Sequence, residues 1–124
     1  MRSYGGGDLT SQGSPYARFR RALSTGNAHI AWAAATELEH IDLQDALELV
    51  LLVVGDRRHS AAATRWLGRL CLEAPGVTLA RVQLAANALA GLPDRIAARA
   101  LADVCAELGL PRAAAATQRA FIDA

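Results

Sequence analysis

Apolar residues recur along this chain at intervals of three and four positions, which is the spacing of an amphipathic helix. The pattern begins after Ser14 and continues to the last residue. Short breaks containing glycine or proline interrupt it, and residues that cap helices well, such as Asn27, Asp42 and Thr78, stand where it resumes. The pattern predicts an all-α protein of six to seven short antiparallel helices with tight connections.

The apolar faces of these helices predict the core. We expect the segment from Leu47 to Val54 to be central, because every residue in it except Glu48 is apolar. Ile30, Cys71 and Leu79 are also predicted to face inward, each on its own helix. The tripeptide Gly-Leu-Pro occurs twice, at 91–93 and 109–111, where it is expected to end one helix and begin the next.

The even spacing of the predicted helices resembles that of helical-repeat proteins of the HEAT, TPR or armadillo kind. The resemblance is one of architecture, because none of the TPR consensus positions occurs in the chain. A compact bundle and a helical-repeat array need the same local signals, so both stay open. Residues 1–14, rich in glycine and small polar residues, are predicted to be a disordered tail, and residues 15–124 a single domain.

Composition narrows the class of partner. The 124 residues carry a net charge of only +1, which argues against bulk nucleic acid or an anionic membrane as a partner. All thirteen basic residues are arginine, a composition typical of high-GC bacterial genomes. The stretch Leu49–Val54 is too short to span a bilayer and Met1 is not followed by an apolar run, so we expect a cytoplasmic protein. Cys71 and Cys105 are interpreted as buried thiols.

The chemistry-bearing residues form no convincing active site. Glu37 and His40 have the Glu-x-x-His spacing of di-iron bundles, but both fall on the polar side of their helix. His59 borders an apolar face and is interpreted as a partly buried structural histidine. No nucleophile motif and no phosphate-binding loop occurs in the sequence, so we expect a protein that is not an enzyme and has no metal or cofactor.

Three large apolar residues fall outside the predicted core: Trp32, Leu72 and Leu84. Scattered surface hydrophobes are common, but such residues also form interfaces. The leading hypothesis is therefore a non-enzymatic helical interaction module that binds a protein partner or itself through them.

A second hypothesis comes from the segment Leu101–Gln118. It has apolar residues at Val104 and Leu108, a glycine at the turn, and then a further helix, and it is similar to a helix-turn-helix. The resemblance implies a DNA-binding regulator using residues 101–120. Its candidate DNA contacts would be Arg112, Thr117, Gln118 and Arg119.

Overall fold

The computed structural model describes residues 14–123. Every regular element in that range is an α-helix, which confirms the predicted all-α class. Contacts divide the chain into two units, Met1–Ile41 and Asp42–Ala124. The sequence pattern predicts a single domain over residues 15–124 and gives no sign of a boundary at Ile41. The predicted tail, residues 1–14, lies outside the described residues except for Ser14.

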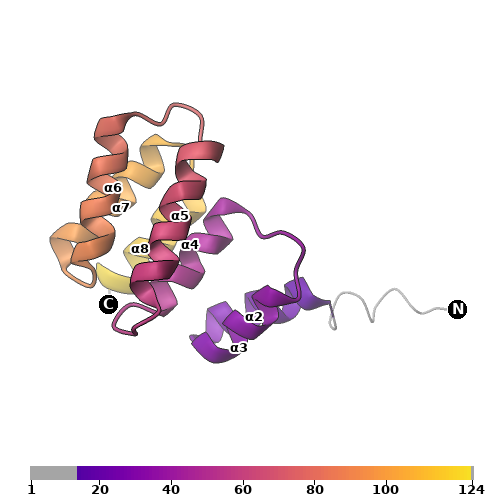
Figure 1. Ribbon diagram of the computed structural model, residues 1–124. Helices are drawn as coiled ribbons and strands as arrows, with labels where there is room; N and C mark the ends of the chain where they lie inside the picture. The colour runs from indigo at the N-terminus through magenta and orange to yellow at the C-terminus, as the bar shows by residue number, and fades with distance from the viewer. Residues whose placement is uncertain (1–13, 124) are drawn as a thin grey trace, which may run out of the picture. The chain divides into compact units, whose positions relative to one another are not determined.

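Unit 1 is a helical hairpin of α2 (Pro15–Thr25) and α3 (Ala28–Thr36) (Figure 1). The Asn27 side chain caps α3, as the sequence predicts. The Ser14 hydroxyl caps α2, although Ser14 belongs to the predicted tail. Between the two helices, Gly26 has a φ of 75°, a left-handed conformation that glycine adopts without a steric cost.

The predicted inner face of the second helix is wrong in part. The pattern predicts that Ile30, Ala31, Ala34, Leu38 and Ile41 face inward. Ala31 and Ala34 are buried, as predicted, but Ile30 is 52% exposed. Because α3 is apolar on nearly every side, periodicity alone does not show which side faces α2. Leu38 and Ile41 were expected on the same face but lie beyond the end of the helix at Thr36.

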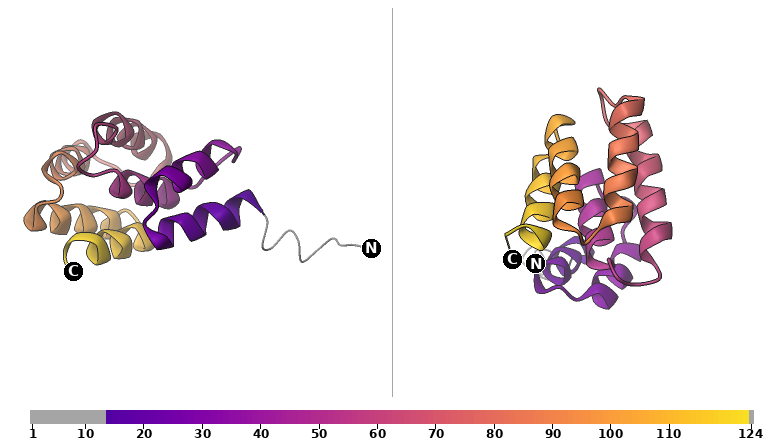
Figure 2. Two further views of the ribbon diagram at one scale, coloured as in Figure 1. Left: turned by 90° about the horizontal axis from the view of Figure 1, so that it is seen from below. Right: turned by 90° about the vertical axis from the view of Figure 1, so that its left-hand side faces the viewer.

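Unit 2 contains five helices, and their contacts form a closed ring (Figures 1 and 2). They are α4 (Leu43–Leu52), α5 (His59–Glu73), α6 (Leu79–Gly91), α7 (Arg95–Glu107) and α8 (Pro111–Phe121). Each helix packs against the next, and α8 also packs against α4. In a repeat array each unit contacts only its neighbours along the chain, so the α8–α4 contact makes unit 2 a bundle.

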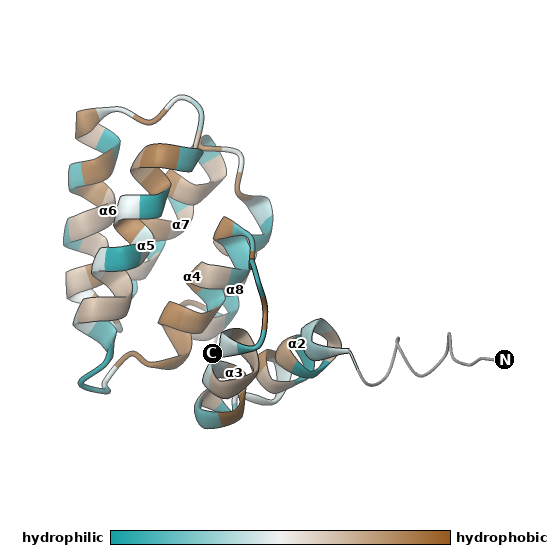
Figure 3. Cartoon of the chain, turned by 45° about the vertical axis from the view of Figure 1, so that its right-hand side comes forward, coloured by the Kyte–Doolittle hydropathy of each residue, from teal (hydrophilic) through white to brown (hydrophobic). Residues whose placement is uncertain are grey.

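The core of unit 2 is built around α4 and Trp66. Leu47 and Val53 are fully buried, which confirms the central place predicted for this apolar segment. The Trp66 indole Nε1–H donates a hydrogen bond to the Leu43 carbonyl at 2.8 Å, so its polar group is satisfied inside the core. Figure 3 shows hydrophobic and hydrophilic residues together on the helices, as expected for amphipathic packing.

Two residues predicted to face inward do not. Leu79 is 74% exposed and Cys71 is also exposed. On α6 the buried face contains Ala85, and at about 100° per residue Leu79 lies about 120° away from it around the axis. On α5 the buried face is centred on Trp66, and Cys71 lies about 140° from it by the same rule.

The two Gly-Leu-Pro corners have different structures. Gly109 has a φ of 77°, and the Leu110 N–H donates to the Cys105 carbonyl at 2.8 Å, which closes the end of α7. Gly91 remains helical, and the Leu92–Pro93 peptide is cis. A Cβ at Gly91 would lie 2.9 Å from the Cβ of Ala97. One corner therefore needs glycine for its backbone conformation, and the other for a close approach.

Candidate functional site

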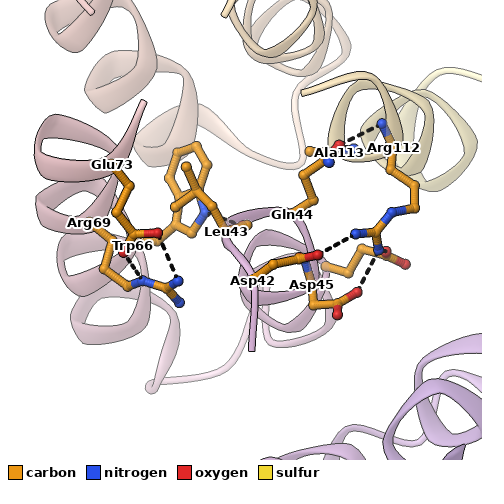
Figure 4. Close-up of polar contacts among 10 residues, drawn as sticks. Asp42, Leu43, Gln44, Asp45, Trp66, Arg69, Glu73, Arg112 and Ala113 are labelled. Carbon is orange, nitrogen blue, oxygen red and sulfur yellow. Dashed lines mark hydrogen bonds and ion pairs between the residues drawn. The ribbon is translucent and has the colours of Figure 1, made fainter. Parts of the chain in front are cut away.

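The contact between α4 and α8 includes a polar cluster, which we call the α4–α8 clasp: Asp42, Gln44, Asp45, Glu48 and Arg112. Figure 4 labels all of these residues except Glu48. The Arg112 guanidinium contacts Asp45 Oδ1 at 2.5 Å and Asp42 Oδ2 at 2.7 Å. Glu48 Oε2 lies 3.6 Å from the same guanidinium. Asp45 is only 1% exposed, so its carboxylate depends on this partner for compensation.

The amide of Gln44 caps α8 from a different helix. Its Oε1 accepts hydrogen bonds from the backbone N–H groups of Arg112 at 2.7 Å and Ala113 at 3.0 Å (Figure 4). Leu110, the residue before α8, has no side chain that could do this. The clasp therefore both neutralises Arg112 and satisfies the first turn of α8, which is a packing role.

This arrangement affects the four residues of the helix-turn-helix hypothesis. Arg112 is held in the clasp. Thr117 is fully buried, and its hydroxyl donates to the Ala113 carbonyl at 2.9 Å, so it offers no surface to DNA. Gln118 and Arg119 are exposed. Of the four implied contacts, Thr117 is thus buried, and Arg112 is held in the clasp with its side chain 39% exposed.

A second surface feature lies where α5 ends and α6 begins. We call it the apolar corner: Cys71, Leu72, Pro75 and Leu79. All four residues are exposed, and Leu72 is 88% exposed. Unlike Leu72, Leu79 was missed from the sequence, because its position after the Thr78 cap resembles the start of an inner face.

Ion pairs border the apolar corner on both helices. The Arg81 guanidinium donates to the Gly76 carbonyl at 3.0 Å and to Glu107 at 3.3 Å, which ties the α5–α6 connection to α7. Arg69 pairs with Glu73 at 2.7 Å along α5 (Figure 4). The corner is therefore braced, and the charges beside it are already paired.

The other two residues of the interaction hypothesis lie elsewhere. Leu84 is 51% exposed, as predicted, but lies about 140° around α6 from Leu79 at 100° per residue. Trp32 belongs to α3 of unit 1 and is half-buried. Of the three residues of the interaction hypothesis, only Leu72 therefore belongs to the apolar corner.

Between α5 and α6, the bundle has a groove of about 340 Å³. Its lining includes His59, Ser60, Ala63, Leu67, Ala86 and Ala90. The His59 ring is half-buried, as predicted, and its Nε2 lies 2.9 Å from the Leu89 carbonyl oxygen. Its Nδ1 is buried and has no hydrogen-bond partner.

The remaining titratable groups do not gather into a site. Glu37 pairs with Arg18 at 2.7 Å, and His40 is exposed beyond the end of α3. Among residues 14–123, no three His, Cys, Asp or Glu residues are grouped so that they could hold a metal ion. Burial raises the pKa of the Cys105 thiol to about 12, and hydrogen bonds from Arg58 lower the pKa of the exposed Asp56.

Within the same described range, no helix combines the length and the apolar character that a membrane crossing requires. Comparison of the chain with protein-family models, with curated proteins and with solved structures yields no match.

Proposed function

We propose that unit 2 is a protein-interaction module and that the apolar corner is its contact surface. One observation carries this proposal: Leu72 and Leu79, 88% and 74% exposed, lie on either side of a short helix connection. Isolated exposed leucines are common on protein surfaces. Two of them with Pro75 between them in sequence have the apolar character that is found at the centre of interfaces.

The surroundings of the apolar corner support the same function. Arg69, Glu73 and Arg81 are held in intramolecular pairs, so a partner would meet few unpaired charges near the centre and polar groups at the rim. The bracing of the connection by Arg81 also supports the proposal. A surface that is already ordered loses little conformational entropy when a partner binds.

The test is site-specific photocrosslinking in the native cell. A photoreactive phenylalanine analogue replaces Leu72 in one protein and Ile96 in the control. Ile96 is 80% exposed at the start of α7, beyond the far end of α6, which begins at Leu79 in the corner and is about 20 Å long over its 13 residues. We expect position 72 to crosslink to one protein, either a partner or a second copy of this chain, and position 96 not to do so.

The captured protein is then purified and its affinity is measured. Leu72→Ser and Leu79→Ser are each expected to weaken binding about tenfold or more, the effect of losing a central apolar anchor. Ile96→Ser is the matched control and should leave binding unchanged. No specific crosslink at position 72, or equal losses from all three variants, would contradict the proposal.

DNA binding is the alternative that the sequence raised, and it has less support than the apolar corner. Arg112 and Thr117 are occupied in packing, which leaves Gln118 and Arg119 to contact a phosphate backbone. A titration of the purified chain with duplex DNA at low and high salt separates the two ideas. The interaction module predicts no salt-dependent binding in that experiment.

A further inference from the structure

The groove between α5 and α6 is separate from the apolar corner. Its lining comes from residues 59–67 of α5 and residues 86–90 of α6, whereas the apolar corner lies where α5 ends and α6 begins. The groove exists because small side chains face each other across the two helices, among them Ala63, Ala86 and Ala90. Its volume of about 340 Å³ is that of a small-molecule pocket rather than of a packing defect.

The lining favours a neutral, mostly apolar occupant. It consists of alanine and leucine side chains with the hydroxyls of Ser60 and Thr64 and the ring of His59. The Thr64 hydroxyl is already used, since it donates to the Ser60 carbonyl at 2.8 Å. No arginine, aspartate or glutamate lines the groove, so a charged ligand would find no counter-charge there.

His59 supplies the second, independent observation. A carbonyl oxygen can only accept, so the contact at 2.9 Å to Leu89 assigns the proton of the neutral ring to Nε2. Nδ1 is then an acceptor. Within residues 14–123 it is the one buried side-chain nitrogen or oxygen without a hydrogen-bond partner. Leaving such an atom unpaired costs free energy, which a donor at this position would recover.

We propose that this groove is a binding site for a small neutral molecule with an apolar body and one O–H or N–H group that donates to Nδ1 of His59. Nδ1 is covered in the ligand-free chain, so binding includes a small tilt of the His59 ring that uncovers Nδ1 while Nε2 keeps its hydrogen bond to the Leu89 carbonyl. The site uses none of the residues of the apolar corner and goes beyond the proposed interaction with a protein.

Phenol and toluene are suitable probes, because they have nearly the same size and only phenol has an O–H donor. Each is titrated into the full-length chain while the amide signals of Ala86 and Ala90 and the ring ¹⁵N signals of His59 are followed by NMR. We expect saturable binding, with phenol about fivefold tighter than toluene, the effect of one neutral hydrogen bond. The Nδ1 signal should shift with phenol alone.

Two variants test where the probes bind. Ala90→Leu fills the groove and should abolish binding of both, whereas Ala80→Leu, at an exposed position of α6 outside the lining, should not. His59→Phe should make the two affinities equal. If that variant does not fold, the phenol-to-toluene ratio of the unchanged protein and the Ala90→Leu result still decide the question.

Absence of saturable binding, or binding that survives Ala90→Leu, would overturn the groove as a site. Equal affinities for phenol and toluene in the unchanged chain would overturn the role of Nδ1. None of these results depends on Leu72 or Leu79, so failure of the proposed interaction surface would be seen separately.

Discussion

Two of the contacts that close the five-helix ring are built in opposite ways. The α4–α8 contact is held by directional polar groups, with Asp42, Asp45 and Gln44 around the first turn of α8. The α5–α6 contact is made largely by small side chains and leaves a groove beside it. The difference follows from chain connectivity: α5 and α6 are joined by a short connection, residues 74–78, whereas α4 and α8 are the first and last helices of the ring.

Bringing distant segments together costs more conformational entropy than keeping neighbours together. The α4–α8 contact must offset that cost and fix the register of α8, and the clasp supplies specific partners for both. The α5–α6 pair is held together by its own connection and can therefore tolerate loose packing. This comparison indicates why the groove and the exposed leucines lie on the α5–α6 side.

The largest expected loss of stability at the α4–α8 contact comes from Arg112→Ala. It leaves the buried Asp45 carboxylate without its cation, and we expect a loss of about 3 kcal/mol in the free energy of unfolding. Urea denaturation measures it, with Trp66 fluorescence read in a Trp32→Phe background so that the signal comes from unit 2. Arg119→Ala, exposed on the same helix, should change stability by less than about 0.5 kcal/mol. Equal effects would show that the clasp does not stabilise the ring.

Gln44→Ala tests the cap that α4 provides to α8. The variant removes the acceptor for two backbone N–H groups, and we expect a loss of about 1 kcal/mol, as for other helix caps. The matched control is Gln83→Ala at an exposed position of α6, where no loss is expected. Hydrogen exchange of the Arg112 and Ala113 amides should accelerate in Gln44→Ala alone; unchanged exchange would contradict the cap.

The helices themselves were largely predictable because their signals are local. The caps at Asn27, Asp42 and Thr78 lie within three residues of the N–H groups that they satisfy, and the structure confirms them. The sixth predicted helix, α7, is expected to begin at Pro93 but begins at Arg95, because the side chain of Asp94 caps it. The exposure of Leu72 and Leu84 also followed from periodicity.

The closure of the ring could not be predicted from the sequence. Gln44 and Arg112 are 68 residues apart, and nothing near either residue indicates the other. The same tripeptide at 91–93 and 109–111 was expected to form the same corner, but packing against Ala97 and the end of α7 gives two different structures. The groove between α5 and α6 could not be predicted from the sequence, because it arises from space that small side chains leave between the two helices.

Two glycine-to-alanine variants are expected to change the free energy of unfolding by smaller amounts and in opposite directions. Gly68 lies inside α5, and a Cβ there would meet nothing within 4 Å, so Gly68→Ala should stabilise the chain by about 0.5–1 kcal/mol. Gly109, which precedes α8, has a φ of 77°, so Gly109→Ala should destabilise it by about 1 kcal/mol. Thermal unfolding of both variants measures the difference. A destabilised Gly68→Ala would mean that something packs closely on this face of α5.

The reactivity of the two cysteines tests the packing of α5 and α7 without any mutation. Cys71 lies on the exposed face of α5, whereas Cys105 is fully buried in α7. Burial raises the pKa of Cys105 from 9.0 to about 12, so its thiol stays protonated and unreactive at neutral pH. We expect a thiol reagent at pH 8 to modify one cysteine rapidly and the second only after unfolding; rapid modification of both would contradict the packing of α7.

The raised pKa of Cys105 also predicts that the free energy of unfolding depends on pH. Below pH 9.0 the thiol is protonated in the folded and the unfolded chain, so Cys105 contributes nothing to the pH dependence there. Between 9.0 and about 12 only the unfolded chain releases the proton, so stability falls as pH rises through that window. Urea titrations at pH 8 and pH 10 should show a smaller decline in Cys105→Ala than in Cys71→Ala. An equal decline in both would place the buried thiol of α7 in contact with solvent, as Cys71 is on α5.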